Sequence, residues 1–170
     1  MIRRWGYLGA AVLIGLAAVV YGAGLDALLD PAVPVFGDLG GHIAPILELR
    51  SRLARGVIHD WSFSWYGGFP LFYFYFPLPS LTALALAAVV GIGRAITVVV
   101  VAGPLLLPLA SAALVRATGG TKAGAALAAA GSGYFVLARS LTLSGGTLES
   151  SMVGEFSYAF AMAASLFYLA

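Results

Sequence analysis

The chain contains 170 residues, of which 61% are hydrophobic and only 9% are charged. Its mean hydropathy is +0.98. Because an ordinary soluble domain carries about 25% charged residues, this composition excludes a typical water-soluble globular protein and indicates an integral membrane protein. The formal net charge of +2 is too small, and the Lys and Arg residues are too scattered, for a nucleic-acid-binding surface. The absence of cysteine excludes disulfides, thiol catalysis and cysteine-ligated zinc.

Uncharged windows predict the membrane-spanning helices, because a hydrocarbon core of about 30 Å requires about 20 apolar residues. The sequence therefore predicts an all-α fold, a polytopic transmembrane helix bundle that forms a single transmembrane domain. The predicted helices are about 5–25, 71–93, 95–115, 123–138 and 156–170. The last window supplies fewer residues than a full crossing needs, so we expect the chain to be the truncated N-terminal part of a longer protein.

The first helix follows Arg3 and Arg4, which by the positive-inside rule hold the N-terminus in the cytoplasm. We therefore expect a multi-pass protein of the cell membrane. The same segment could also be a cleaved signal peptide, since 21–24 supplies small residues near a cleavage site. Its apolar run is longer than the roughly 7–15 residues of a typical signal, which favours a retained anchor.

Residues 26–70 form the predicted extracytoplasmic loop, which holds all the Asp and His residues of the chain. A glycine-rich turn at 37–41 precedes a segment, 42–58, whose apolar residues recur at helical spacing. This pattern predicts an amphipathic helix on the membrane surface. Its water-facing side is predicted to carry Glu48, Ser51, Arg52 and Arg55. Arg50 projects from the apolar side, where a cation normally finds an acid, a phosphate or a route to the headgroups.

The next segment, 71–93, is interrupted near its start by Pro77 and Pro79. It therefore either crosses the membrane fully or is re-entrant. The choice decides on which side of the membrane the predicted polar loop 140–154 and Glu155 lie. Counting positive charges favours the re-entrant case, which places Glu155 on the extracytoplasmic side.

Four stretches of the chain carry a resemblance to a known family. They are GDLGGH (37–42), LRSRLARG (49–56), WSFSWYGGFP (61–70) and YFPLP (75–79). The chain resembles the membrane proteins named for a 6-pyruvoyl-tetrahydropterin-synthase-related domain, which belong to the GT-C glycosyltransferase superfamily. The resemblance implies a GT-C-like fold that transfers sugars from polyprenyl-phosphate-linked donors on the extracytoplasmic side. The implied partners are membrane lipids and that donor, with no nucleic acid.

The family places an acidic residue in the first extracytoplasmic loop, and Asp38 matches that position. Sugar transfer requires a carboxylate that takes the acceptor proton or holds a metal on the leaving phosphate, and a cation that stabilises that phosphate. Asp38 is therefore the catalytic candidate and a candidate ligand of Mg or Mn. Many members carry two neighbouring acids, whereas Leu39 and Gly40 follow Asp38 here. The candidate substrate-binding residues are His42, Arg50, Arg52, Trp65, Tyr66 and Glu155.

Each assignment has a structural alternative. Asp38 could serve only as a helix N-cap, the arginines could bind anionic headgroups, and the aromatic residues could form a belt at headgroup depth. His59 and Asp60 could act as further polar groups of the site. At the level of the whole protein, the alternatives are a non-catalytic scaffold or lipid-handling protein, which the lone acid favours, and a transporter, which the proline-interrupted helices favour. Residues 1–170 alone are expected to be inactive, because a donor cavity needs further helices.

Overall fold

The computed structural model describes residues 6–34, 37–64, 67–139 and 145–170. Most of these residues are helical, as the sequence predicts, and the described strands form one short hairpin. The chain divides into two compact units, of which unit 1 comprises Met1–Leu29 and Val100–Ala170 and unit 2 comprises Asp30–Val99. Each unit has its own buried apolar cluster.

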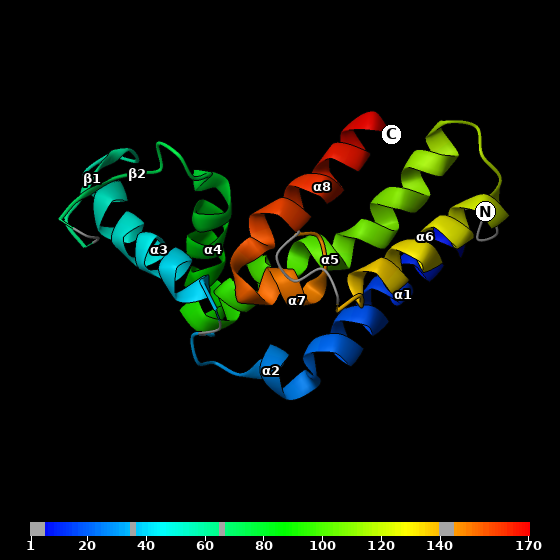
Figure 1. Cartoon of the computed structure of the whole chain (residues 1–170), viewed down its shortest axis with the longest axis horizontal. Coiled ribbons are helices and arrows are strands. Elements are labelled where there is room, and N and C mark those ends of the chain that lie inside the picture. The colour runs from blue at the N-terminus through cyan, green and yellow to red at the C-terminus, as the bar shows by residue number, and fades with distance from the viewer. Residues whose placement is uncertain (1–5, 35–36, 65–66, 140–144) are drawn as a thin grey trace. The chain divides into compact units, whose positions relative to one another are not determined.

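The regular elements in the described part of unit 1 are all helices. Its elements are α1 (Gly6–Ala23), α2 (Leu25–Leu29), the larger part of α5 (Ile92–Ala117), α6 (Lys122–Val136), α7 (Leu148–Ser150), the π-helical turn η2 (Ser151–Glu155) and α8 (Phe156–Leu169). α1 packs along α6 (Figure 1). Small residues make this contact, with Ala11, Ala125 and Ala129 fully buried in one cluster. Small side chains let helix backbones approach closely where the surroundings are apolar.

Two helices in the described part of the chain are long and apolar enough to cross a membrane. One is α5, and the other is the run Leu148–Leu169 that α7, η2 and α8 form together. α5 contains the whole of the predicted helix 95–115 and continues through Pro104 and Pro108. These two helices are compatible with a membrane location.

The other helix ends differ from the predicted ones in ways that local chemistry explains. α1 and α6 lie close to the predicted 5–25 and 123–138. The helix predicted over 42–58 corresponds to α3, which runs over Leu39–Leu53. It stops early because Gly56 adopts a φ of 72° and its N–H bonds to the Leu53 carbonyl at 3.0 Å, a turn that glycine makes without steric cost.

The sequence predicts a polar loop over 140–154, but the described part of it is helical from Leu148 onward. Thr147 begins this helix with a capping box. Its Oγ1 accepts a hydrogen bond from the Ser150 N–H at 3.1 Å, and the Ser150 hydroxyl accepts one from the Thr147 N–H at 3.1 Å. Such reciprocal bonds satisfy backbone donors that a helix start otherwise leaves open, so short polar residues begin this helix instead of forming a loop.

Unit 2 combines α3, α4 (Pro77–Val90) and the start of α5 with the hairpin of β1 (Asp60–Ser62) and β2 (Phe69–Leu71). α3 packs against α4, and β1 pairs with β2 in antiparallel register, Trp61 opposite Pro70 (Figure 1). The core of this unit is the cluster of Leu49 from α3 with Leu71 and Phe72 at the end of β2. The hairpin is therefore held on α3 by apolar burial.

The predicted helix 71–93 is shorter in the structure. Residues 69–71 pair with β1, and α4 begins only at Pro77. A proline fits the first helical turn because the N–H that it lacks would have no partner there. α4 ends at Gly91, whose φ is 81°. Its 14 residues rise about 21 Å, less than the roughly 30 Å of a hydrocarbon core, so α4 by itself is too short for a full crossing.

Replacing Gly103 with Ala is expected to destabilise unit 1 by about 1–3 kcal/mol. Gly103 is buried in α5, and a Cβ placed there would overlap the backbone of Ala159 and Phe160 in α8. Gly131→Ala is the matched control, because no atom lies within 4 Å of a Cβ at Gly131 in α6. It should leave the stability unchanged or raise it by up to about 1 kcal/mol. SDS titration of the protein in mixed micelles measures both, and equal stabilities would contradict the close approach of α5 and α8.

Candidate functional site

Asp38 lies at the N-terminal end of α3, in a turn that Gly37 opens. Its backbone carbonyl accepts a hydrogen bond from the Gly41 N–H at 2.9 Å. Its side chain is exposed and makes no capping hydrogen bond, although Asp38 occupies the N-cap position. Capping is the usual structural role of an aspartate at this place. The structure does not show that role, and it shows no ion pair of the Asp38 carboxylate with the other described residues.

His42 lies one turn further along α3 and is half-buried. Its ring meets that of Tyr75 edge to face, with the ring centroids 5.5 Å apart and the planes at 79°. Tyr75 belongs to the segment that follows β2. The contact therefore brings the start of α3 beside an aromatic segment more than thirty positions later in the chain, and the sequence did not indicate Tyr75 as a neighbour of the site.

Arg52 is buried, with 2% of its surface exposed. Its Nη1 pairs with the Asp60 Oδ2 at 2.8 Å, and its Nη2 donates to the Trp61 carbonyl at 2.8 Å and to the Glu48 carboxylate. Glu48 also accepts a hydrogen bond from the Ser62 hydroxyl. We call Arg52, Glu48, Asp60, Ser62 and the Trp61 carbonyl the Arg52 clamp. It joins α3 to β1 through charge-assisted hydrogen bonds.

The prediction that Arg52 lies on the water-facing side of its helix is therefore wrong. The hairpin covers this side of α3 and supplies acceptors that the guanidinium needs once it is out of water. A donor phosphate would reach Arg52 only by displacing these protein partners. Asp60, considered as a further acid of the site, also belongs to the clamp. The i,i+4 spacing of Glu48 and Arg52 is the signal in the sequence that could have indicated their pairing.

Arg50 is exposed on α3. An α-helix rises about 1.5 Å per residue, so Arg50 lies about 18 Å further along the helix axis than Asp38. Asp38 and Arg50 therefore lie near opposite ends of α3.

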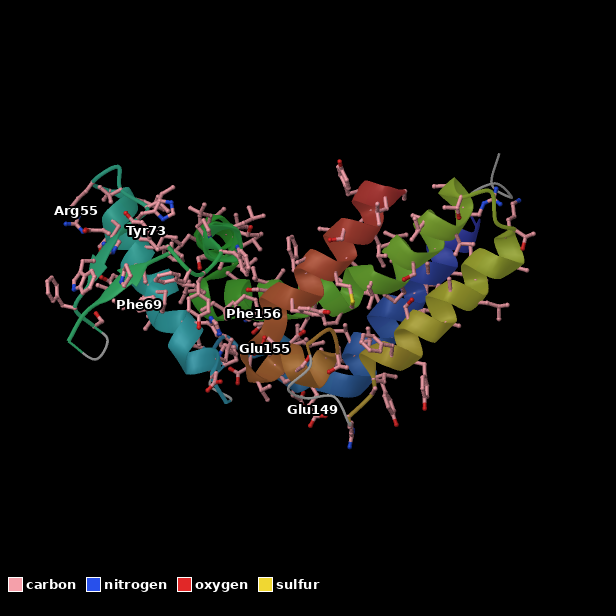
Figure 2. The ribbon with its side chains drawn as sticks, turned by 45° about the horizontal axis from the view of Figure 1, so that its top comes forward. Arg55, Phe69, Tyr73, Glu149, Glu155 and Phe156 are labelled. Atoms are coloured by element: carbon pink, nitrogen blue, oxygen red, sulfur yellow. The ribbon has the colours of Figure 1, made fainter. Side chains whose placement is uncertain are left out.

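The remaining candidates belong to other segments of the chain. Trp65 and Tyr66 are outside the described residues. Glu155 is exposed at the end of η2 in unit 1 (Figure 2), whereas Asp38 belongs to unit 2. His59 places its ring beside Tyr73, with centroids 5.5 Å apart. Of the predicted site, only Asp38 and His42 share one end of α3 in the described structure.

A divalent metal at Asp38 would need further protein oxygens or a histidine nitrogen. Within the ranges that the structure describes, no group of three or more His, Asp or Glu side chains could hold a metal ion. Asp38 and His42 alone make an incomplete donor set, so no step of the reaction below is assigned to Mg or Mn.

Comparisons of the chain with protein-family models, with curated proteins and with solved structures found no match.

Proposed function

We propose that the protein is a multi-pass membrane glycosyltransferase of the GT-C type. It moves a sugar from a polyprenyl-phosphate-linked donor to an acceptor hydroxyl on the extracytoplasmic side. The observation that carries this proposal is the exposed carboxylate of Asp38, which neither caps α3 nor pairs with a described cation. An accessible carboxylate without a structural partner is suited to accept a proton from a substrate.

In this reaction the acceptor oxygen attacks the anomeric carbon of the donor. The bond between that carbon and the phosphate oxygen breaks, and polyprenyl phosphate leaves with the bonding electrons. Asp38 takes the proton of the acceptor hydroxyl. Arg52 takes no part because the clamp engages it. Another cation must therefore stabilise the leaving phosphate, and the exposed Arg50 remains a candidate.

The other predicted residues keep supporting roles in the proposal. His42 positions Tyr75 beside the start of α3, which shapes the surroundings of the Asp38 carboxylate. Trp65 and Tyr66 remain candidates for stacking on the sugar, because aromatic rings offer an apolar face. Glu155 remains a candidate for binding an acceptor hydroxyl.

A non-catalytic membrane scaffold or lipid-handling protein is the second candidate. The observation that favours it is the incomplete donor set, with no third His, Asp or Glu near Asp38 among the described residues. The use of Arg52 and Asp60 in the clamp points the same way, since it removes two charged groups from a site.

The experiment that tests the proposal is a transfer assay with the full-length protein in proteoliposomes. Polyprenyl phosphate carrying a radiolabelled sugar is supplied as donor, and label in a water-soluble or lipid acceptor is counted. Label moving to an acceptor supports the transferase. Solute or lipid flux without transfer would favour a transporter, and binding of the donor without either would favour the scaffold.

A cysteine at Ser51, which is exposed on α3, is expected to react with an impermeant maleimide in intact cells. The reason is that the proposal places α3 outside the cytoplasm, and the native chain contains no cysteine to interfere. A cysteine at Ile2 is the control, and it should react only after permeabilisation, because Arg3 and Arg4 hold the N-terminus inside. Reaction at Ser51 only in permeabilised cells would contradict the GT-C assignment.

A further inference from the structure

Unit 2 exposes a run of aromatic rings between β2 and α4. Residues 73–76, Tyr-Phe-Tyr-Phe, are each between 55% and 74% exposed. We call these four residues the aromatic surface. Leu78, in the first turn of α4, is 57% exposed as well. Contiguous apolar side chains exposed to this extent mark an interaction site, because soluble surfaces rarely carry them.

The rings of the aromatic surface are held in place by contacts on their inner side. The ring centroid of Phe69 in β2 lies 6.4 Å from that of Phe74 and 6.3 Å from that of Tyr75. Tyr75 also meets His42, and Tyr73 meets His59. These contacts connect the aromatic surface to β2, to the start of α3 and to the connection between α3 and β1.

A cation lies at the same end of unit 2. Arg55 is exposed in the turn between α3 and β1, the connection that also carries His59, whose ring contacts that of Tyr73. Figure 2 labels Arg55 and Tyr73 at the same end of unit 2. The two acids of α3 and β1, Glu48 and Asp60, both pair with Arg52 inside the clamp, which leaves the clamp with one negative charge. Arg50 and Arg55 outweigh that charge, so residues 48–60 carry a net charge of +1.

We propose that the aromatic surface and Arg55 rest in the headgroup layer of the membrane. The rings lie at the boundary with the acyl chains, and the Arg55 guanidinium binds the phosphate of an anionic phospholipid. Tyr combines an apolar ring with a polar hydroxyl, which suits this depth. Arginine near a bilayer is attracted by anionic lipid and presents a donor fork that matches phosphate.

Charge and composition favour a bilayer over a protein as the occupant. Residues 48–60 carry three arginines and two acids, a net charge of +1, which is complementary to anionic headgroups. The described part of the chain also contains two helices that are long and apolar enough to cross a membrane, which is consistent with a bilayer next to the protein. This inference rests on the membrane placement in the proposed function, but it does not require that the protein transfers sugar.

The test uses spin labels on single cysteines introduced at Phe74 and at Tyr158 of the full-length protein. Tyr158 is the control because it lies near the middle of the apolar run Leu148–Leu169 and is 55% exposed. Accessibility to oxygen and to a water-soluble nickel complex is measured in vesicles of phosphatidylcholine with phosphatidylglycerol. We expect the Tyr158 label among the acyl chains and the Phe74 label at the headgroup boundary.

The lipid contact of Arg55 is tested in the same vesicles. Adding phosphatidylglycerol to phosphatidylcholine should move the Phe74 label deeper. Arg55→Gln should abolish this shift and Arg55→Lys should keep most of it, since the interaction depends on positive charge. A shift that survives in Arg55→Gln would overturn the assignment of Arg55.

The outcomes separate this inference from the proposed function. If the Phe74 label is accessible to the nickel complex while the Tyr158 label lies in the acyl chains, the inference is wrong and the membrane placement still holds. A Phe74 label reached by neither reagent would overturn it too, because protein would then cover the aromatic surface. Both labels open to nickel would refute the membrane placement itself.

Discussion

Replacing Asp38 with Asn in the full-length protein is expected to slow sugar transfer by about 100-fold or more. An amide cannot take the acceptor proton, and a positioned general base contributes about 10²–10⁴-fold to a rate. The Asp38 side chain is exposed and makes no capping bond, so the variant should insert and fold normally, since exposed substitutions change stability by about 0.5 kcal/mol or less. Transfer of labelled sugar in proteoliposomes measures the rate.

Asp26→Asn is the matched control, because Asp26 is an exposed acid in the first turn of α2 and loses the same charge. It should transfer sugar at the rate of the unchanged protein. An Asp38 variant that retains most of its activity, with equal amounts of protein in the membrane, would exclude Asp38 as the base. Equal losses in both variants would indicate a general effect of charge.

Removing both acids of the Arg52 clamp is expected to destabilise unit 2 by about 3–5 kcal/mol. Glu48→Gln with Asp60→Asn leaves a guanidinium that is 2% exposed without a counter-charge. Arg52→Met should cost less, because the side chains of Glu48 and Asp60 are 22% and 45% exposed and can recover water when the cation is lost. The double acid variant should therefore lose more free energy of unfolding than Arg52→Met. This order would show that the buried guanidinium depends on its acidic partners more than they depend on it.

Unfolding of both variants can be followed by SDS titration, with tryptophan fluorescence as the signal. Arg55→Gln is the control, because Arg55 is exposed beside the clamp, and it should change the free energy of unfolding by about 0.5 kcal/mol or less. If Arg52→Met loses more free energy of unfolding than the double acid variant, the acids depend on the cation for their stability, and the assignment is wrong.

The long helices could be placed from the sequence because a helix satisfies its own backbone and needs only a continuous apolar window. α5 covers the whole predicted segment 95–115. Pro77 and Gly91 are also the residues at which α4 begins and ends. From the sequence alone, the proline is interpreted as a break within a helix and not as its start. The position of Asp38 directly ahead of a helix was predicted. Asp38 and Arg50 were assigned to one site, although the helical rise places them about 18 Å apart along the helix axis.

The interior side of α3 could not be predicted in the same way. Helical periodicity shows which residues share a side of the helix. Arg52 is buried, however, only because the hairpin packs against α3 and brings Asp60 and the Trp61 carbonyl into contact with it. The partners of His42 and His59 are likewise aromatic residues of the segment after β2. Each of these contacts joins parts of the chain that local patterns treat as independent.

Composition and uncharged length by themselves determined that the chain is mostly helical and apolar enough for a membrane, because these properties depend on each segment and its solvent. Only the tertiary structure decided which charges remain available for chemistry. Desolvation of a cation costs less when nearby acids and a carbonyl replace its water, and for Arg52 those groups come from another segment of the chain. Asp38 has no such replacement among the described residues and stays exposed.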